Sequence, residues 1–130
     1  MKQEEKDLLL KDLCARLPYV VKISIPDLWT HDRDIEILDE IFKGDDGLYR
    51  VNSKGQLIEH IKPYLFPLSS MTEEQIQELE SLMEVTTIPK WGEFLSPTPE
   101  YYDWLNKNKF DYRGLIPKGL ANDATGLGVY

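Results

Sequence analysis

Residues 61–83, IKPYLFPLSSMTEEQIQELESLM, contain an extended segment that is followed at once by a helix. Pro63 and Pro67 have no backbone N–H to donate to a sheet ladder, so we expect the residues around them at a sheet edge or a strand exit rather than in a central strand. The helix is expected to begin after Thr72, because Thr72 and Gln75 have capping-box spacing, in which each side chain bonds to the other residue's backbone N–H. The stretch therefore predicts a strand-to-helix junction, and it contains no catalytic motif.

The residues that precede this junction predict a helix and then a strand. Leucines recur at helical spacing between Glu4 and Leu17, and Pro18 closes the segment. Cys14 lies among these leucines, which predicts a buried, inert thiol. Apolar and polar residues then alternate over Tyr19–Ile25, the pattern of a half-buried strand.

Two further segments before residue 61 have strand character. Ile35–Phe42 fits a strand or a helix face, and we favour a strand because the segment is rich in β-branched residues and is followed by a GDDG turn. Gly47–Val51 and Gln56–Ile61 flank the turn NSKG at 52–55, which predicts a β-hairpin.

The second half of the chain predicts two helices. The helix after Thr72 carries Ile76, Leu79 and Met83 on one face, which is expected to pack on the sheet. Residues 85–97, VTTIPKWGEFLSP, are expected to form an irregular connector with a short strand at 85–88. Thr98 as N-cap and Pro99 as first helical residue introduce a helix over 100–109.

These elements predict one α+β domain over residues 1–130. A chain of 130 residues with 42% hydrophobic residues is the size of one ordinary domain and is able to bury a core. We expect a small, mostly antiparallel sheet of about four strands, packed with an N-terminal helix and the two helices of the second half. Residues 119–130 are expected to form an irregular tail, with a turn near 113–116.

Composition narrows the classes of function. The net charge is −8, and residues 63–95 contain one lysine against six glutamates, a field that repels a nucleic acid backbone. The apolar runs are too short to cross a bilayer, and the N-terminus lacks the apolar core of a secretory signal, so we expect a cytoplasmic protein without a membrane partner. The chain has a single cysteine, which cannot form an internal disulfide, and unpaired thiols are ordinary in the cytoplasm.

One cluster has side chains that bind metals. The segment PDLWTHDRD offers one imidazole and three carboxylates, from Asp27, His31, Asp32 and Asp34. An Asp-rich turn between two strands explains the same residues, because Asp side chains bond to their own backbone in turns. We favour the turn, and we predict no metal, no cofactor and no catalytic residue. His60 is likewise expected to be a surface or partly buried residue rather than a general base.

The aromatic and basic stretch WLNKNKFDYRGLIPK at 104–118 is the candidate binding surface. Tryptophan, tyrosine and arginine are the residue types that dominate protein interfaces, and the residues selected here are Trp104, Phe110, Tyr112 and Arg113. The same stretch, with Lys107 and Lys109, suits a single strand of nucleic acid, whose bases stack on aromatic rings. A structural alternative is that the lysines complement the end of the preceding helix and the aromatic rings cap the core.

Three segments carry a resemblance to a known family. DLCARLPY at 12–19, IKPYLFPLSSMTEEQ at 61–75 and FDYRGLIPKGLA at 110–121 together resemble a family of small uncharacterised proteins from gut bacteria and their phages. That family has no established activity, cofactor or catalytic residues, so the resemblance implies only a context, an accessory protein of a phage or mobile element.

The leading hypothesis is therefore a non-enzymatic cytoplasmic module that binds another protein. The alternatives are a nucleic-acid-associated accessory protein that uses residues 104–118, and a metal-dependent enzyme that uses the Asp and His cluster at 27–34.

Overall fold

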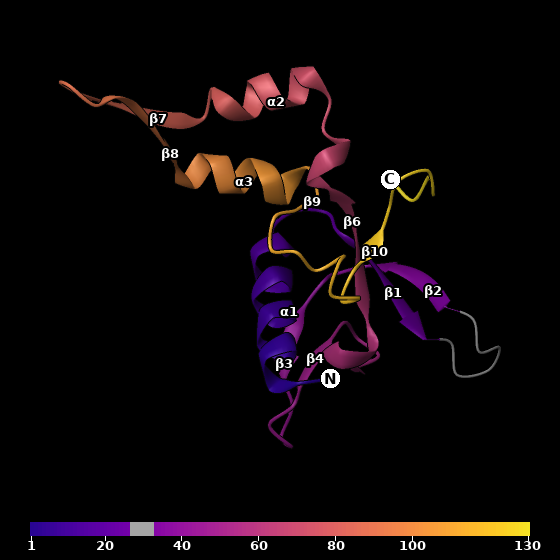
Figure 1. Ribbon diagram of the computed structural model, residues 1–130. Coiled ribbons are helices and arrows are strands. Elements are labelled where there is room, and N and C mark those ends of the chain that lie inside the picture. Colours follow the sequence, from indigo (N-terminus) through magenta and orange to yellow (C-terminus); the bar gives the residue numbers. More distant parts are fainter. Residues whose placement is uncertain (27–32) are drawn as a thin grey trace.

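The computed structural model describes residues 1–26 and 33–130, which form an α+β structure (Figure 1). Its α-helices are α1 (Gln3–Arg16), α2 (Glu73–Glu80) and α3 (Pro99–Lys107), and two 3-10 turns, η1 (Ile58–His60) and η2 (Leu68–Ser70), flank the strand β6. The predicted fold class, with one N-terminal helix and two helices in the second half, is confirmed.

The main sheet is built around β6. Its strands are β1 (Lys22–Pro26), β2 (Arg33–Ile37), β6 (Lys62–Pro67), β9 (Phe110–Asp111) and β10 (Asn122–Asp123). The order is β10-β6-β1-β2, and β9 pairs with the far end of β6. β1 is antiparallel to β2 and β6, whereas β9 and β10 run parallel to β6. The sheet is therefore mixed, because the C-terminal quarter of the chain returns to it.

Two smaller sheets complete the described strands. β3 (Ile41–Lys43), β4 (Tyr49–Val51) and β5 (Gln56–Leu57) form one antiparallel sheet. β7 (Met83–Ile88) and β8 (Gly92–Pro97) form a hairpin that pairs with no other described strand.

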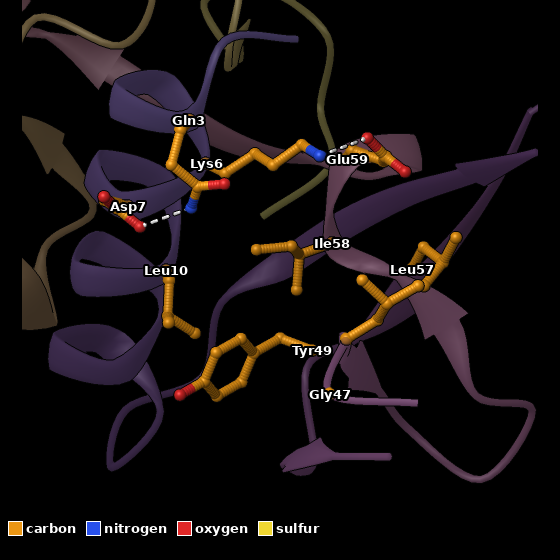
Figure 2. Close-up of a pocket in the computed structure, with 10 residues that line it drawn as sticks. Gln3, Lys6, Asp7, Leu10, Gly47, Tyr49, Leu57, Ile58 and Glu59 are labelled. Atoms are coloured by element: carbon orange, nitrogen blue, oxygen red, sulfur yellow. Dashed lines mark hydrogen bonds and ion pairs between the residues drawn. The ribbon is translucent and has the colours of Figure 1, made fainter. Parts of the chain in front are cut away.

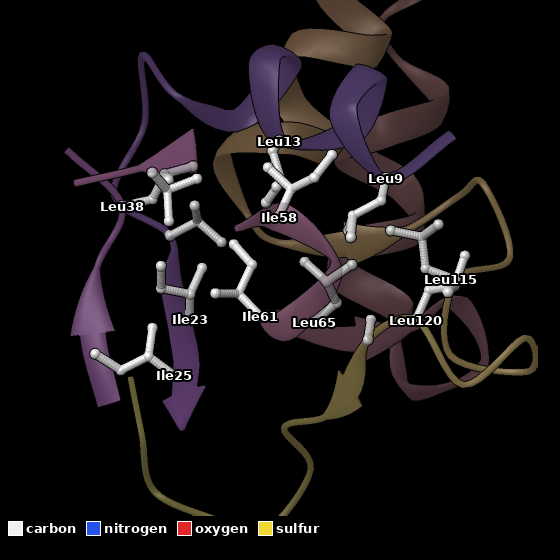
Figure 3. Packing of buried hydrophobic residues seen from close by; sticks show 13 residues of the cluster. Leu9, Leu13, Ile23, Ile25, Leu38, Ile58, Ile61, Leu65, Leu115 and Leu120 are labelled. Carbon is white, nitrogen blue, oxygen red and sulfur yellow. The ribbon is translucent and has the colours of Figure 1, made fainter. Parts of the chain in front are cut away.

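The core lies between α1 and the main sheet. Leu9 and Leu13 of α1 face Ile23, Ile61 and Leu65 of the sheet region, and Figure 3 shows these side chains interleaved. The C-terminal segment closes the same core with three buried residues, Leu115, Leu120 and Ala121. Removal of this apolar surface from water drives the folding of the body, here the described residues outside 83–97.

The expected edge position of the proline-flanked segment is wrong. β6 is central, with β1 on one side and β10 on the other. The ladder with β1 contains two residue pairs, including Ile23 with Pro63, and β9 and β10 each add two more. Because several short ladders replace one long one, a missing proline N–H interrupts little pairing.

The strands predicted before β6 are present, but their bounds differ. The strand expected over Tyr19–Ile25 begins only at Lys22 and includes Pro26. The segment Ile35–Phe42 contains the end of β2 and the start of β3, which belong to different sheets, and residues 38–40 between them lie in neither strand. The hairpin around residues 52–55 is present as β4 and β5. Residues 58–60 form a 3-10 turn instead of continuing the strand, and His60 lies exposed there.

The helix starts are confirmed, and the helix ends are shorter than predicted. The Gln75 N–H donates to Thr72 Oγ1 at 3.2 Å, and the Thr72 N–H donates to Gln75 Oε1 at 2.9 Å. Thr98 caps α3 in the same way, with the Tyr101 N–H 3.2 Å from its hydroxyl. α2 ends at Glu80, and its buried Leu79 packs in one cluster with α3 and with Phe110 of β9, so it reaches only the end of the main sheet.

Three further predictions differ from the structure. Residues 85–97 are a regular hairpin rather than an irregular connector. Residues 119–130 include β10, so this segment joins the main sheet. Cys14 is exposed, because the buried stripe of α1 is formed by residues 9, 12, 13 and 16 and the helix turns residue 14 away from it.

Candidate functional site

The hairpin of residues 83–97, here called the projecting hairpin, extends beyond α2 and α3 and away from the main sheet (Figure 1). Its register pairs Val85 with Leu95 and Thr86 with Phe94. Every strand residue except Met83 is exposed. The sequence builds this hairpin from β-branched and aromatic residues, which favour strands.

A tight turn forms the tip. The Trp91 N–H donates to the Ile88 carbonyl oxygen at 3.0 Å, so Pro89 and Lys90 occupy the central positions of a β-turn. Lys90 has a φ of 78°, the left-handed value that a type II turn requires at its second central residue and that usually selects glycine. The turn thus holds a strained lysine and presents Trp91 next to it.

Exposed apolar side chains lie on both faces of the projecting hairpin. Directly paired residues share a face, so Val85 and Leu95 lie on one face. Phe94 and Ile88 lie on the opposite face, because the side-chain period of a strand is two. Leu95 is 59% exposed and Trp91, at the tip, is 77% exposed. A hairpin with this much uncovered apolar area is typical of an interaction site.

A second apolar cluster fixes the base of the hairpin to the body. Its buried members are Leu79, Trp104, Leu105 and Phe110, and Phe66 of β6 packs against them. The rings of Trp104 and Phe110 are stacked, with centroids 5.6 Å apart and an interplanar angle of 4°. The Thr98 hydroxyl also donates to the Leu82 carbonyl oxygen across the hairpin base. The helices therefore hold the projecting hairpin in a defined direction.

The structure brings the four predicted binding residues together, but mostly below the surface. Trp104 and Phe110 are 9% and 3% exposed. The Tyr112 hydroxyl lies 3.2 Å from Asn106 Oδ1, and the Arg113 guanidinium lies over the Tyr112 ring at 4.4 Å. Partner binding by these four residues stays a prediction, and the burial of Trp104 and Phe110 gives these two a packing role instead.

Arg113 belongs to a buried ion cluster that joins α1 to the C-terminal segment. Asp12 accepts from Arg16 Nε at 2.8 Å and from Arg113 Nη1 at 2.9 Å. Arg16 also donates to the Phe110 carbonyl oxygen at 2.7 Å, and both Asp12 and Arg16 are fully buried. Arg16 Nη1 has no hydrogen-bond partner within the described residues. The three segments that carry the family resemblance meet at this cluster and along the pairing of β6 with β9.

A shallow pocket of about 130 Å³ lies between α1 and the β4–β5 sheet (Figure 2). Leu10, Tyr49 and Ile58 supply its apolar walls, and the ion pair of Lys6 with Glu59, 3.2 Å long, lies at its rim. The hydrogen bond from Lys6 and its charge hold the pKa of Glu59 below its usual value. This volume is below the roughly 300 Å³ at which small-molecule sites begin.

A second hollow of about 430 Å³ is lined by residues that include Lys109 and Tyr130. The Lys109 ammonium lies 5.0 Å from the centre of the Tyr130 ring. Burial, with the charges of Arg16 and Lys107, lowers the pKa of Lys109. Burial raises the pKa of Tyr130 to about 12, and its hydroxyl donates to the Tyr64 carbonyl oxygen at 2.8 Å. These contacts fix the C-terminal residue on the main sheet.

The described residues bear on the two alternative functions only in part. Asp27, His31 and Asp32 lie outside the described residues, and Asp34 lies in β2 opposite Ile25. Among residues 1–26 and 33–130, no group of three or more His, Cys, Asp or Glu side chains is placed to hold a metal ion. For nucleic acid, Phe110 is buried and Arg113 is paired with Asp12, so two groups needed for stacking and neutralisation are occupied.

Comparison of the chain with protein-family models, with curated proteins and with solved structures finds no match. The resemblance to proteins of gut bacteria and their phages therefore stays a prediction. Within the described part of the chain, no helix has both the length and the apolar character needed to cross a membrane.

The projecting hairpin was not predicted from the sequence. Asn-Gly or Asp-Gly, the strongest hairpin turn signals, do not occur between residues 85 and 97. The available signal was Pro89 followed two residues later by Trp91 and Gly92, flanked by β-branched residues on one side and Phe94 and Leu95 on the other.

Proposed function

We propose that the protein is a non-enzymatic cytoplasmic module that binds another protein through the projecting hairpin. One observation carries the proposal: Val85, Ile88, Trp91, Phe94 and Leu95 are all exposed on an element that pairs with no other described strand. Uncovered apolar area of this kind is costly in water unless a partner removes it. The aromatic tip adds a residue type that dominates binding energy in interfaces.

The anchoring of the hairpin supports the same proposal. The stacked pair of Trp104 and Phe110 and the buried Leu79 hold the helices from which the hairpin extends. A surface that is positioned before binding loses less conformational entropy when the partner arrives. Trp104 and Phe110, two of the four contact residues predicted from the sequence, are thus better suited to support the contact surface than to form it.

The test compares two leucine substitutions of matched exposure. Leu95→Ser changes the projecting hairpin, and Leu127→Ser changes the C-terminal segment, where the leucine is 56% exposed. Tagged wild-type and variant proteins are isolated from the native host, and bound proteins are quantified by mass spectrometry. We expect Leu95→Ser and Trp91→Ala each to weaken capture of a specific partner at least about tenfold, as loss of an interface hot spot does. Leu127→Ser is expected to leave it unchanged.

Circular dichroism of each variant controls for folding. If the Leu95→Ser and Trp91→Ala proteins stay folded and retain every partner of the wild type, the hairpin is not the binding surface and the proposal is wrong.

A further inference from the structure

The charge of the molecule is concentrated around the projecting hairpin. Residues 71–107, which contain α2, the hairpin and α3, carry eight acidic residues and two basic residues, a net charge of −6. The whole chain carries −8. An acidic surface of this size attracts basic surfaces and repels acidic ones over distances of about 10 Å at ordinary salt.

The pairing register places one carboxylate directly among the apolar residues. Glu93 is opposite Thr87 and shares a face with Val85 and Leu95. A partner that covers these two apolar side chains also removes Glu93 from water. A carboxylate taken out of water without a cation is strongly unfavourable, so the covering surface has to supply a lysine or an arginine at that position.

The second face sets the shape of the partner. Phe94 and Ile88 are exposed on the face opposite to Val85 and Leu95, and Trp91 extends at the tip. A flat surface covers one face of a two-stranded ribbon and leaves the other face in water. Burial of both faces requires a cleft with two walls, into which the ribbon inserts tip first.

We infer, on the basis of the proposed function, that the partner is a protein with an apolar cleft that receives the hairpin. A lysine or arginine on the wall of this cleft pairs with Glu93, and basic residues at its entrance face Glu80 and Glu84. Both of these glutamates are exposed near the base of the hairpin. A second copy of this chain is disfavoured as the occupant, because the same net charge of −6 would face itself. An anionic lipid surface is disfavoured for the same reason.

Two photocrosslinking positions test the cleft. Benzoylphenylalanine is placed at position 95 on one face and, in a separate protein, at position 94 on the other face, and both are irradiated in the native host. We expect both positions to crosslink to one and the same protein, at two different peptides that form facing walls. A control probe at position 127 is expected to give no crosslink to that protein.

The charge test uses the crosslinked protein once it is purified. Glu80→Gln, Glu84→Gln and Glu93→Gln in one chain are expected to slow association about tenfold at low salt and to flatten its salt dependence. A matched triple variant in the body, Glu4→Gln, Glu40→Gln and Asp45→Asn, changes the net charge equally and is expected to have a much smaller effect. Glu93→Lys is expected to abolish binding, and an acidic residue at the partner's paired position is expected to restore it.

The outcomes separate this inference from the function on which it rests. If only one of the two positions gives a crosslink, or if the glutamate substitutions leave the association rate unchanged, the inference of a basic cleft is wrong. Binding through the hairpin is still supported in that case. Crosslinks to a second copy of the chain, or binding of the purified protein to vesicles of phosphatidylcholine alone, also overturn it. No crosslink from either position contradicts both the inference and the proposed function.

Discussion

At the scale of single residues, the most consequential arrangement is the buried pair of charges on α1. Asp12 and Arg16 are one helical turn apart, and both are fully buried. An amphipathic pattern places charged residues such as these on the solvent face of a helix, so their burial was not expected. Their burial is sustained by contacts from residues about a hundred positions away, Arg113 and the Phe110 carbonyl oxygen. The ion cluster thus joins the two ends of the chain.

Asp12→Asn is the first prediction at this scale. It removes the carboxylate charge that Arg16 and Arg113 share, and leaves the fully buried Arg16 cation without a counter-ion. Breaking a buried ion pair from one side costs about 3–5 kcal/mol of unfolding free energy, which urea denaturation measures. Asp46→Asn removes the exposed pair with Arg50 and serves as the control with a far smaller loss. Equal losses in the two variants would contradict a special role for the buried cluster.

Lys90→Gly is the second prediction at this scale. Lys90 has a positive φ at the tip of the projecting hairpin, a conformation that costs a non-glycine residue about 1–2 kcal/mol. Glycine removes this cost, but it also has more conformational freedom in the unfolded chain, which offsets part of the gain. The hairpin is therefore expected to be more stable by up to about 1 kcal/mol. Hydrogen exchange of the Trp91 amide, which bonds to Ile88, is expected to slow. Lys90→Ala loses the same charge and keeps the strain, so its exchange is not expected to slow.

At the scale of elements, local sequence chemistry predicted the starts of α2 and α3 well. Thr72 with Gln75, and Thr98 with Pro99, act within one helical turn, and no distant residue is needed to satisfy them. The positions of the strands in the sheets depend instead on pairing between distant segments. β6 is central despite its prolines because β10, some sixty residues later, returns to it. The projecting hairpin was missed because its turn uses a lysine where glycine is usual, and its binding role rests on exposure, which a sequence pattern does not reveal.

The C-terminal segment carries a prediction about pH. The Tyr130 hydroxyl accepts from the Lys22 N–H at 2.8 Å and donates to the Tyr64 carbonyl oxygen, and burial raises its pKa from 10.0 to about 12. The unfolded chain therefore loses this proton first as the pH rises. Stability from Tyr130 is fully present below pH 10 and is lost between about pH 10 and pH 12.

Urea denaturation at several pH values measures this effect against Tyr130→Phe. The phenylalanine variant has no hydroxyl to ionise, so its unfolding free energy is expected to fall less steeply over this pH range, and its tail to be less protected at neutral pH. Parallel pH profiles for the two proteins would show that the hydroxyl contacts do not hold the tail.

At the scale of the whole molecule, stability and proposed function are assigned to separate parts. The two buried apolar clusters contain no residue of the projecting hairpin, whereas Trp104 of α3, the helix that follows it, is a member of one. The body is therefore expected to fold without the hairpin. The hairpin depends on the body only for its direction, which the helices and the stacked pair of Trp104 and Phe110 supply.

Removal of residues 84–96 tests this separation. Met83 and Pro97 are paired across the hairpin base, where facing residues lie only about 5 Å apart, so two glycines close the gap. We expect the midpoint of thermal unfolding to change by no more than a few degrees, because no core side chain is lost, while the partner captured by the intact protein is lost completely. Trp104→Ala is the opposite case: its cavity costs about 3–5 kcal/mol and lowers the midpoint by about 10 °C or more. A hairpin deletion that lowers the midpoint as much as Trp104→Ala does would mean that the hairpin is a structural element, and its exposed apolar residues would then need another explanation.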